Sequence, residues 1–316
     1  MRHLLPILVN QTILVMIFLI MAVVWMMRDE RDRTRPLLVI ALVLNMFYGL
    51  LLNVVMGKEN GLVPWKYDYI LARLDAAFGI PASAIAPVLQ GAARWPLQIV
   101  YWLLVPMMVV WFAVARRNRL TGSLVGAYIT ELLMGPTLYA VLPACGPRYV
   151  FGKQWLHPPV VAPGVLRLSG SPNAFPSLHF ATALIFVFFS NGRISRFFSL
   201  AFLAGTALAT ISTGEHYAID LVAGLAFGCF ANNVGRRRVK ASLLWLPVVL
   251  AWSLSVRWAS GFWIGHPYLL RIFAAVTVIG AAWAVVVEWR RAMPTTTEKE
   301  KPPQQRSGLK EMEQLS

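Results

Sequence analysis

Two histidines and one aspartate have the residue types and the spacing for nucleophilic and acid–base chemistry. His216 and Asp220 lie four residues apart in STGEHYAIDLVAG, residues 212–224, so on a helix they would share one face. The carboxylate could then accept a hydrogen bond from one ring nitrogen and leave the other free to attack. His179, in SGSPNAFPSLHF at residues 169–180, could protonate a leaving oxygen. Both segments open apolar helices, whose N-termini attract phosphate.

The chain around these segments is strongly apolar. Of its 316 residues 58% are hydrophobic and 14% are charged, against about 45–50% and about 25% in an ordinary globular protein. Apolar runs of about 20 residues recur along it, and each is long enough to cross a bilayer as a helix. This composition excludes a soluble enzyme and predicts an all-α, polytopic integral membrane helical bundle.

We expect about nine transmembrane helices, each long enough to span the hydrocarbon core. Glu131, within the fourth of them, is interpreted as one half of a structural polar pair. The expected spans are residues 6–27, 36–56, 96–115, 122–143, 176–190, 197–213, 215–234, 241–257 and 268–289.

Residues 64–83, between the second and third spans, are expected to form an amphipathic helix in the membrane interface. Ile70, Leu74, Ala77 and Phe78 fall on one helical face, and the charged side chains Lys66, Arg73 and Asp75 fall away from it. The chain is then expected to divide into four parts: 1–95 with two spans and this helix, 96–235 as the catalytic membrane core, 236–293 with two further spans, and 294–316 as a disordered cytoplasmic tail.

The net charge of +15 comes from basic residues clustered between apolar runs, as in the cytoplasmic loops of membrane proteins. Counting Lys and Arg on alternate sides predicts an N-terminus outside, a C-terminus in the cytoplasm and both histidine segments on the extracytoplasmic face. We expect the cell (inner) membrane as the location and no binding of nucleic acid.

The two polar segments resemble the type 2 phosphatidic acid phosphatase superfamily, which carries a PSxH element followed by HxxxD. FPSLH, HYAID and the upstream GPRYVF are similar to its branch of inositol phosphorylceramide synthases and related inositolphosphotransferases. The likeness covers about residues 64–230. It implies a six-helix phosphatase-type core in which His216 takes the phosphoryl group as phosphohistidine and Asp220 orients it. It also implies that His179 protonates the leaving group and then activates the acceptor.

The sequence departs from the phosphatases at their phosphate-binding cations. Their motif of lysine, six residues and Arg-Pro is missing from the expected loop; Lys66 and Arg73 have the spacing, but Leu74 follows and the segment lies two spans too early. Ala209-Thr210 stands where the phosphatases carry Ser-Arg. Arg148 and Lys153 in GPRYVFGK lie in a loop suited to replace these cations, because an arginine fork fits a phosphate. The expected substrate-binding residues are Arg148, Lys153, Ser177 and Arg167.

These features predict a membrane lipid phosphotransferase that moves a phosphoryl or phospho-head group from a lipid phosphate donor to an alcohol. Two alternatives stay open: a lipid phosphate phosphatase with water as acceptor, acting on a phosphatidic acid-like or polyprenyl phosphate-like substrate, and a non-catalytic lipid transporter or scaffold. We expect neither a metal nor a cofactor to take part.

Overall fold

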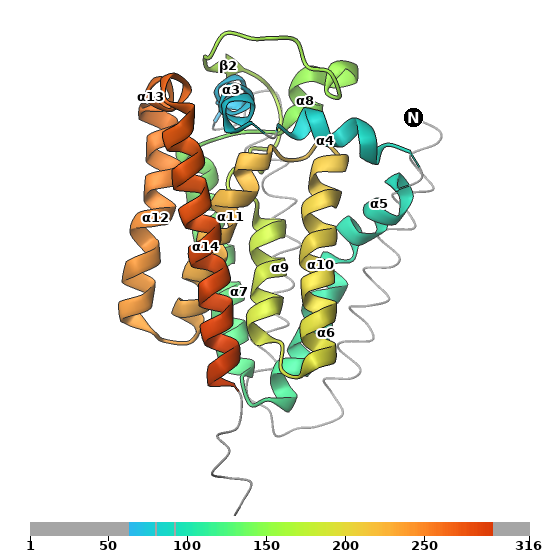
Figure 1. Ribbon diagram of the computed structural model, residues 1–316, viewed down its shortest axis with the longest axis vertical. Coiled ribbons are helices and arrows are strands. Elements are labelled where there is room, and N and C mark those ends of the chain that lie inside the picture. Colours follow the sequence, from blue (N-terminus) through green and yellow to red (C-terminus); the bar gives the residue numbers. More distant parts are fainter. Residues whose placement is uncertain (1–62, 80, 92, 293–316) are drawn as a thin grey trace, which may run out of the picture.

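The computed structural model describes residues 63–79, 81–91 and 93–292. The predicted spans 6–27 and 36–56 and the predicted tail 294–316 lie outside the described residues. The described part is a bundle of helices with one two-stranded antiparallel ribbon (Figure 1), which confirms the all-α class. Its elements are β1 (Trp65–Lys66), α3 (Asp68–Phe78), α4 (Ala82–Leu89), α5 (Arg94–Trp102), α6 (Leu104–Arg117), α7 (Thr121–Val141), α8 (Pro147–Phe151), η2 (Gly152–Gln154), β2 (Leu166–Arg167), α9 (Leu178–Phe189), α10 (Arg193–Ser212), α11 (Ala218–Gly235), α12 (Val239–Trp258), α13 (Ser260–Gly265) and α14 (Pro267–Arg291).

Five of these helices are long and apolar enough to cross a membrane: α7, α10, α11, α12 and α14. The predicted span 96–115 is formed by α5 and α6, which are bent by 55° relative to each other. Large apolar side chains such as Leu200, Leu244 and Val276 are exposed on the outer helices, as a lipid-facing surface requires. The chain is an integral membrane protein.

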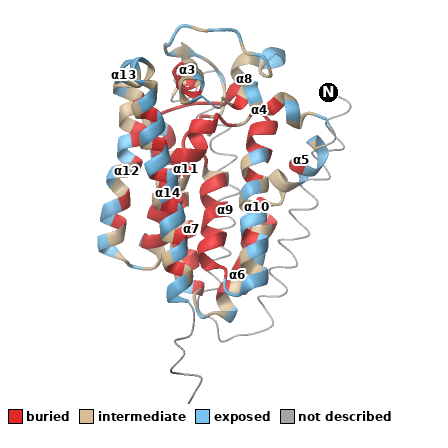
Figure 2. Cartoon of the chain, in the orientation of Figure 1, coloured by how far each residue is buried: buried red, intermediate tan, exposed pale blue. Residues whose placement is uncertain are grey.

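The central helix α9 is shorter than expected. The predicted span 176–190 contains a helix of only 12 residues, about 18 Å long, against a hydrocarbon core of about 30 Å. Helices α6, α7, α10, α11 and α14 all contact it, and every residue from Phe180 to Phe189 is buried (Figure 2). A helix covered by protein on all sides need not match the thickness of the bilayer, because its ends face other protein segments.

Glu131 on α7 has the polar partner that the sequence analysis anticipated. Its Oε2 accepts a hydrogen bond of 2.9 Å from Oγ1 of Thr182 on α9. Both side chains are buried, so this bond joins two helices inside the bundle. The other oxygen, Oε1, is buried without a hydrogen-bond partner among the described residues.

The predicted amphipathic helix 64–83 is instead two helices. The first, α3, ends at Gly79, which has a left-handed φ of +94° that favours glycine, and α4 starts after Pro81. In Figure 1, α3 is seen end-on across the end of the bundle at which α9 and α11 begin. We call this the motif end, because residues 169–180 and 212–224 lie there.

The expected exposure of Lys66 and Asp75 is wrong, because both are buried. The Asp75 carboxylate is used by backbone amides of other segments, and the Lys66 ammonium donates to the carbonyl oxygen of Val63. Helix α3 packs against α11, α13 and α14, so it is part of the bundle's end. An interfacial helix would leave one face to solvent.

The opposite end of the bundle is held by a buried carboxylate between two arginines. Glu288 of α14 lies 3.0 Å from Nη1 of Arg236 and also pairs with Arg238. Glu288 is buried, so the three residues tie the end of α11 to α14 at the greatest distance from the motif end.

Candidate functional site

The structure brings the two predicted histidines together at the motif end. Their rings are 6.2 Å apart between centroids, in an edge-on arrangement. His179 is the second residue of α9, and His216 lies two residues before α11 begins. Two side chains 37 residues apart in sequence therefore face each other from the starts of adjacent helices.

Ser177 places His179 by capping α9. Its backbone is extended, and its side chain accepts from the amide of Phe180 at 3.4 Å. Its own amide donates to the carbonyl oxygen of Asp220 at 3.1 Å, which ties the start of α9 to α11. The side chain is completely buried, so the geometry favours a capping role over the direct substrate contact expected from the sequence.

His216 and Asp220 do not share a helical face as expected. Helix α11 begins at Ala218, and Tyr217 before it has an extended backbone with ψ of 156°. Oδ2 of Asp220 accepts from the Tyr217 amide at 2.8 Å and lies 3.5 Å from Nδ1 of His216. The first amides of a helix lack partners within it, and Asp220 satisfies one of them.

The nearest acceptor for the His216 ring is the carbonyl oxygen of Ala174, 2.8 Å from Nδ1. A carbonyl can only accept, so the proton of the neutral ring must sit on Nδ1. That tautomer leaves the lone pair of Nε2 free. Sequence patterns could not reveal this partner, because a backbone carbonyl leaves no mark in residue type.

Burial keeps His216 neutral. Its side chain is 2% exposed, and burial lowers the pKa of His216 to about 4, although Glu215 and the Ala174 carbonyl act in the opposite direction. At neutral pH the ring is therefore uncharged, as a nitrogen nucleophile must be.

Tyr101 is a site residue that the sequence analysis missed. It comes from α5, and its ring stacks on His179 with centroids 4.4 Å apart and planes inclined by 13°. Stacking restricts the orientation of the imidazole relative to His216. One aromatic residue in an apolar helix carries no signal that distinguishes it from a packing residue.

The loop before α8 touches the His216 turn through its backbone. Gly146 has a φ of +93°, and a Cβ there would lie 2.2 Å from the carbonyl oxygen of Glu215. The amide of Arg148 donates to the carbonyl oxygen of Gly214 at 2.9 Å. The GPRYVFGK loop is therefore in direct contact with the turn that carries His216.

Arg148 is the predicted cation that lies against this turn. Its Nη1 is 3.8 Å from Oε1 of Glu215, and 55% of its side chain is exposed, so the guanidinium can move toward a ligand at small cost. Lys153 on η2 and Arg167 on β2 are exposed and lie farther along the loop. Arg167 pairs with Trp65 across the ribbon.

Glu215, directly before His216, also escaped the sequence analysis. Its carboxylate accepts from the Tyr149 hydroxyl at 3.4 Å and faces Arg148. Burial raises the pKa of Glu215, while nearby His216 and Arg148 and the bond from Tyr149 lower it. The Glu215 carboxylate therefore lies beside Arg148, the cation that the sequence analysis expects to bind phosphate.

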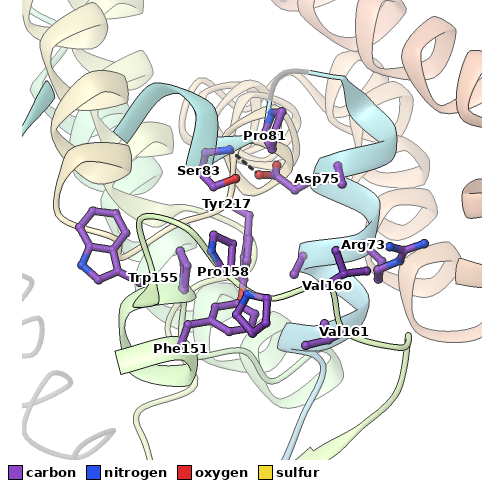
Figure 3. A pocket seen from close by; sticks show the side chains of 15 residues that line it. Arg73, Asp75, Pro81, Ser83, Phe151, Trp155, Pro158, Val160, Val161 and Tyr217 are labelled. Atoms are coloured by element: carbon purple, nitrogen blue, oxygen red, sulfur yellow. Dashed lines mark hydrogen bonds between the residues drawn. The ribbon is translucent and has the colours of Figure 1, made fainter. Parts of the chain in front are cut away.

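A cavity of about 140 Å³ adjoins these residues. Tyr217 and Pro147, the chain neighbours of His216 and Arg148, line it together with Trp155 and Asp75. Figure 3 shows it between α3 and the 155–161 segment, with the Arg73 guanidinium pointing away from it. Arg73 and the buried Lys66 thus give no phosphate clamp here. Across the described ranges, no group of three or more His, Cys, Asp or Glu side chains could hold a metal ion.

A comparison with protein families finds that the model of the PAP2 superfamily matches residues 70–234. The matched region runs from within α3 to the end of α11 and includes His179, His216 and Asp220. Neither the curated proteins nor the solved structures contain a match to this chain.

Proposed function

Because the chain belongs to the PAP2 superfamily, the type 2 phosphatidic acid phosphatases and their relatives, we propose that it is a lipid phosphotransferase that works through a phosphohistidine on His216. Members of this superfamily are phosphatases or phosphotransferases that act on lipid phosphates, and the chain is a membrane enzyme of this kind. The observation that carries the proposal is the pair of facing rings at 6.2 Å in which His216 has a free Nε2.

In the first step the lone pair of Nε2 attacks the phosphorus of a lipid donor. The N–P bond forms as the bond from phosphorus to the leaving oxygen breaks, and the protonated ring of His179 gives that oxygen a proton and becomes neutral. The proton stays on Nδ1 and is donated to the carbonyl oxygen of Ala174, which stabilises the positive charge that develops on the ring. The group that is transferred to His216 is a phosphoryl group or a phospho-head group of the inositol-phosphate kind.

In the second step the neutral His179 takes a proton from an acceptor hydroxyl. The hydroxyl oxygen attacks phosphorus, the N–P bond breaks and its electron pair returns to Nε2. In both steps Arg148 moves from Glu215 to the phosphoryl oxygens. Its positive charge then lies where negative charge develops, which stabilises the transition state. Asp220 holds the turn that carries the nucleophile.

Transfer to an alcohol is proposed ahead of hydrolysis for two reasons. FPSLH with HYAID, and no Lys-x6-Arg-Pro, resembles the phosphotransferase branch. The buried His216 also supports a site in which a bound alcohol can displace water. Hydrolysis remains the second candidate, because the half-exposed Arg148 leaves one side of the site open to solvent.

We further propose that the motif end faces the extracytoplasmic side of the cell membrane. The basis is the alternation of Lys and Arg between the two sides of the bundle. Arg193, Arg196, Arg236 and Arg238 all lie at the end opposite the histidines, where the positive-inside rule places the cytoplasm.

The deciding experiment supplies the purified protein with donors labelled with ³²P: phosphatidic acid, a polyprenyl phosphate and phosphatidylinositol. Each is tested alone and with inositol, diacylglycerol, ceramide or a polyprenol. We expect labelled acceptor to exceed water-derived product with at least one pair. His216→Ala should abolish both products, whereas His157→Ala, an exposed histidine of the same loop region, should not. Water as the sole effective acceptor would make the protein a phosphatase, and full activity in His216→Ala would refute the proposed nucleophile.

A further inference from the structure

Helix α3 carries two aspartates on one face, Asp68 and Asp75, that are 0% and 2% exposed. Seven residues of helix separate them by about 10 Å along the axis. Removing a carboxylate from water is costly unless hydrogen bonds compensate it. The partners of these two groups therefore indicate what they do.

Asp75 caps two helices at once. Its Oδ1 accepts from the amide of Ile219, in the first turn of α11, at 3.1 Å. Its Oδ2 accepts from the amide of Ala82, the first residue of α4, at 2.6 Å. Figure 3 shows Asp75 where α3 meets α4, close to Tyr217. Amides at helix starts need external acceptors, and here one side chain serves both helices.

Asp68 holds the other half of the site. It accepts from the amides of Cys145 at 3.0 Å and Gly146 at 2.8 Å. It also accepts from the hydroxyl of Tyr217 at 3.2 Å. The amides of this irregular loop lie outside any helix, so the carboxylate is what satisfies them.

We propose that Asp68 and Asp75 are positioning residues that set the His216 turn against the Arg148 loop. The inference rests on the proposed function. Its basis is where the contacts fall: Gly146 is two residues from Arg148, Tyr217 follows His216 and Ile219 precedes Asp220. One helix thus hydrogen-bonds to both segments and fixes their distance. A displacement of about 1 Å at a reacting group can lower the rate about 100-fold.

The same contacts alter how the site binds phosphate. The start of α11 would ordinarily attract an anion, but the Ile219 amide is already bonded to Asp75. The start of α11 therefore contributes less to binding the phosphoryl charge, and Arg148 contributes more. The position of the Arg148 loop, which Asp68 sets, then matters more than it would at an open helix end.

The test compares Asp68→Asn and Asp75→Asn with Glu288→Gln in the full-length protein. Asparagine keeps the size of the side chain and one acceptor oxygen, so the fold should hold while the bonds to the other oxygen are lost. Glu288→Gln is the matched control, because it neutralises a buried carboxylate at the opposite end. We expect kcat for transfer from the ³²P-labelled donor to fall about 10- to 100-fold in both α3 variants. The KM should change by less than about threefold, because the substrate-contacting groups remain. Glu288→Gln should keep the kcat of the wild type even if its Tm falls as much as the Tm of the α3 variants.

Two further measurements test whether the position of the Asp75 carboxylate matters as well as its charge, and whether the effect can be seen without the reaction. Asp75→Glu keeps the charge but moves it by about one methylene, and it should also lose kcat. Amide hydrogen exchange over residues 217–219 should accelerate in the Asp75 variants whether or not a substrate is known. Unchanged kcat and exchange in Asp75→Asn would overturn the inference, as would equal loss of kcat in Glu288→Gln at matched Tm. A wild-type protein without any transfer or hydrolysis would instead refute the proposed function.

Discussion

The carbonyl oxygen of Ala174 lies 2.8 Å from Nδ1 of His216, whereas Oδ2 of Asp220 lies 3.5 Å from the same nitrogen. The tautomer of the proposed nucleophile is therefore set by the backbone of Ala174, the residue directly before FPSLH. The carboxylate that completes the HxxxD pattern has a second task, because it accepts from the Tyr217 amide. Orientation of the ring and shape of the turn are thus controlled by different groups.

Asp220→Asn should reduce activity less than loss of the nucleophile does. The amide oxygen can still accept from Tyr217, and Ala174 still holds Nδ1, but the negative charge beside the ring is gone. We expect kcat to fall about 10- to 100-fold, which corresponds to about 1.4–2.7 kcal/mol of barrier. Steady-state transfer kinetics measure this; a loss as complete as that of His216→Ala would mean that the carboxylate itself orients the ring.

The two histidines should fail in different ways. His216→Ala removes the atom that binds phosphorus, so no phosphoenzyme can form. His179→Ala slows the protonation of the leaving group and the activation of the acceptor, so a small amount of intermediate should accumulate with a good leaving group. Alkaline-quench labelling with a ³²P donor distinguishes them, because phosphohistidine is stable in base and is lost when the trapped sample is acidified. A stable labelled intermediate in His216→Ala would locate the nucleophile elsewhere.

The acid limb of the pH–rate profile should lie unusually low. Burial lowers the pKa of His216 to about 4, from the ordinary histidine value of about 6.5. The neutral form that the proposed attack requires therefore persists as the pH falls, and the loss of kcat/KM that protonation of His216 causes should set in only as the pH approaches about 4. A midpoint near 6.5 would show that His216 is solvated in the working enzyme.

Unfolding has to be followed in the same pH series. Unfolded His216 takes up a proton near its ordinary pKa, whereas the folded ring takes it up only at about 4. Its contribution to stability is thus complete above about 6.5 and is lost as the pH falls toward 4. Tm values at each pH separate this loss from the titration of the nucleophile.

Arg148 should be the most sensitive cation of the loop. Arg148→Lys keeps the charge but loses the two-pronged donor geometry, so kcat/KM should fall about tenfold or more. Arg148→Ala should lose more activity still, and Lys153→Ala and Arg167→Ala, which each also remove one positive charge, are its controls and should have smaller effects. If Arg148→Ala kept most activity while Lys153→Ala abolished it, Lys153 would be the clamp.

Glu215→Gln tests the competition for Arg148. Without the carboxylate the guanidinium is free before the substrate arrives, so inorganic phosphate should bind and inhibit more strongly, by roughly fivefold if one ion pair of about 1 kcal/mol is lost. Inhibition constants for phosphate in the wild type and the variant measure this. Weaker inhibition in Glu215→Gln would show that the two groups do not compete.

Orientation in the membrane can be read from two single cysteines. In a background of Cys145→Ala and Cys229→Ala, Ser169→Cys lies at the motif end and Ser195→Cys at the opposite end. An impermeant thiol reagent applied to intact cells should label position 169 and leave position 195 unlabelled. The reverse pattern would place the histidines on the cytoplasmic side.

The helices of the described part and the pairing of the histidines followed from the sequence, because apolar runs and a two-part motif are local signals. The lengths of the helices followed less well. Helix α9 is 12 residues long because Ser177 caps its start and because Ser190, Asn191 and Gly192 follow its last residue.

The aspartates of α3 show why the rest of the site could not be predicted. An acidic residue on an amphipathic helix is usually solvated, and the pattern placed Asp75 on the polar face. Its partner Ile219 is 144 residues away, and a backbone amide is the same at every non-proline position. The sequence did contain one sign of their burial, because Asp68 and Asp75 have the helical spacing that puts them on the same face as the apolar Leu71. In the structure Leu71 is completely buried.

The short central helix sets a depth for the reaction. Helix α9 has 12 residues and α10, which follows it after a short turn, has 20, so in Figure 1 the start of α9 stands below the end of α10. At 1.5 Å per residue the difference is about 12 Å. In the proposed transfer, the phosphorus of a donor lipid has to reach His179 below the end of α10. We therefore expect the difference in length between α9 and α10 to select substrates. Donors and acceptors whose first bulky group lies too close to the reacting phosphorus or hydroxyl should not react.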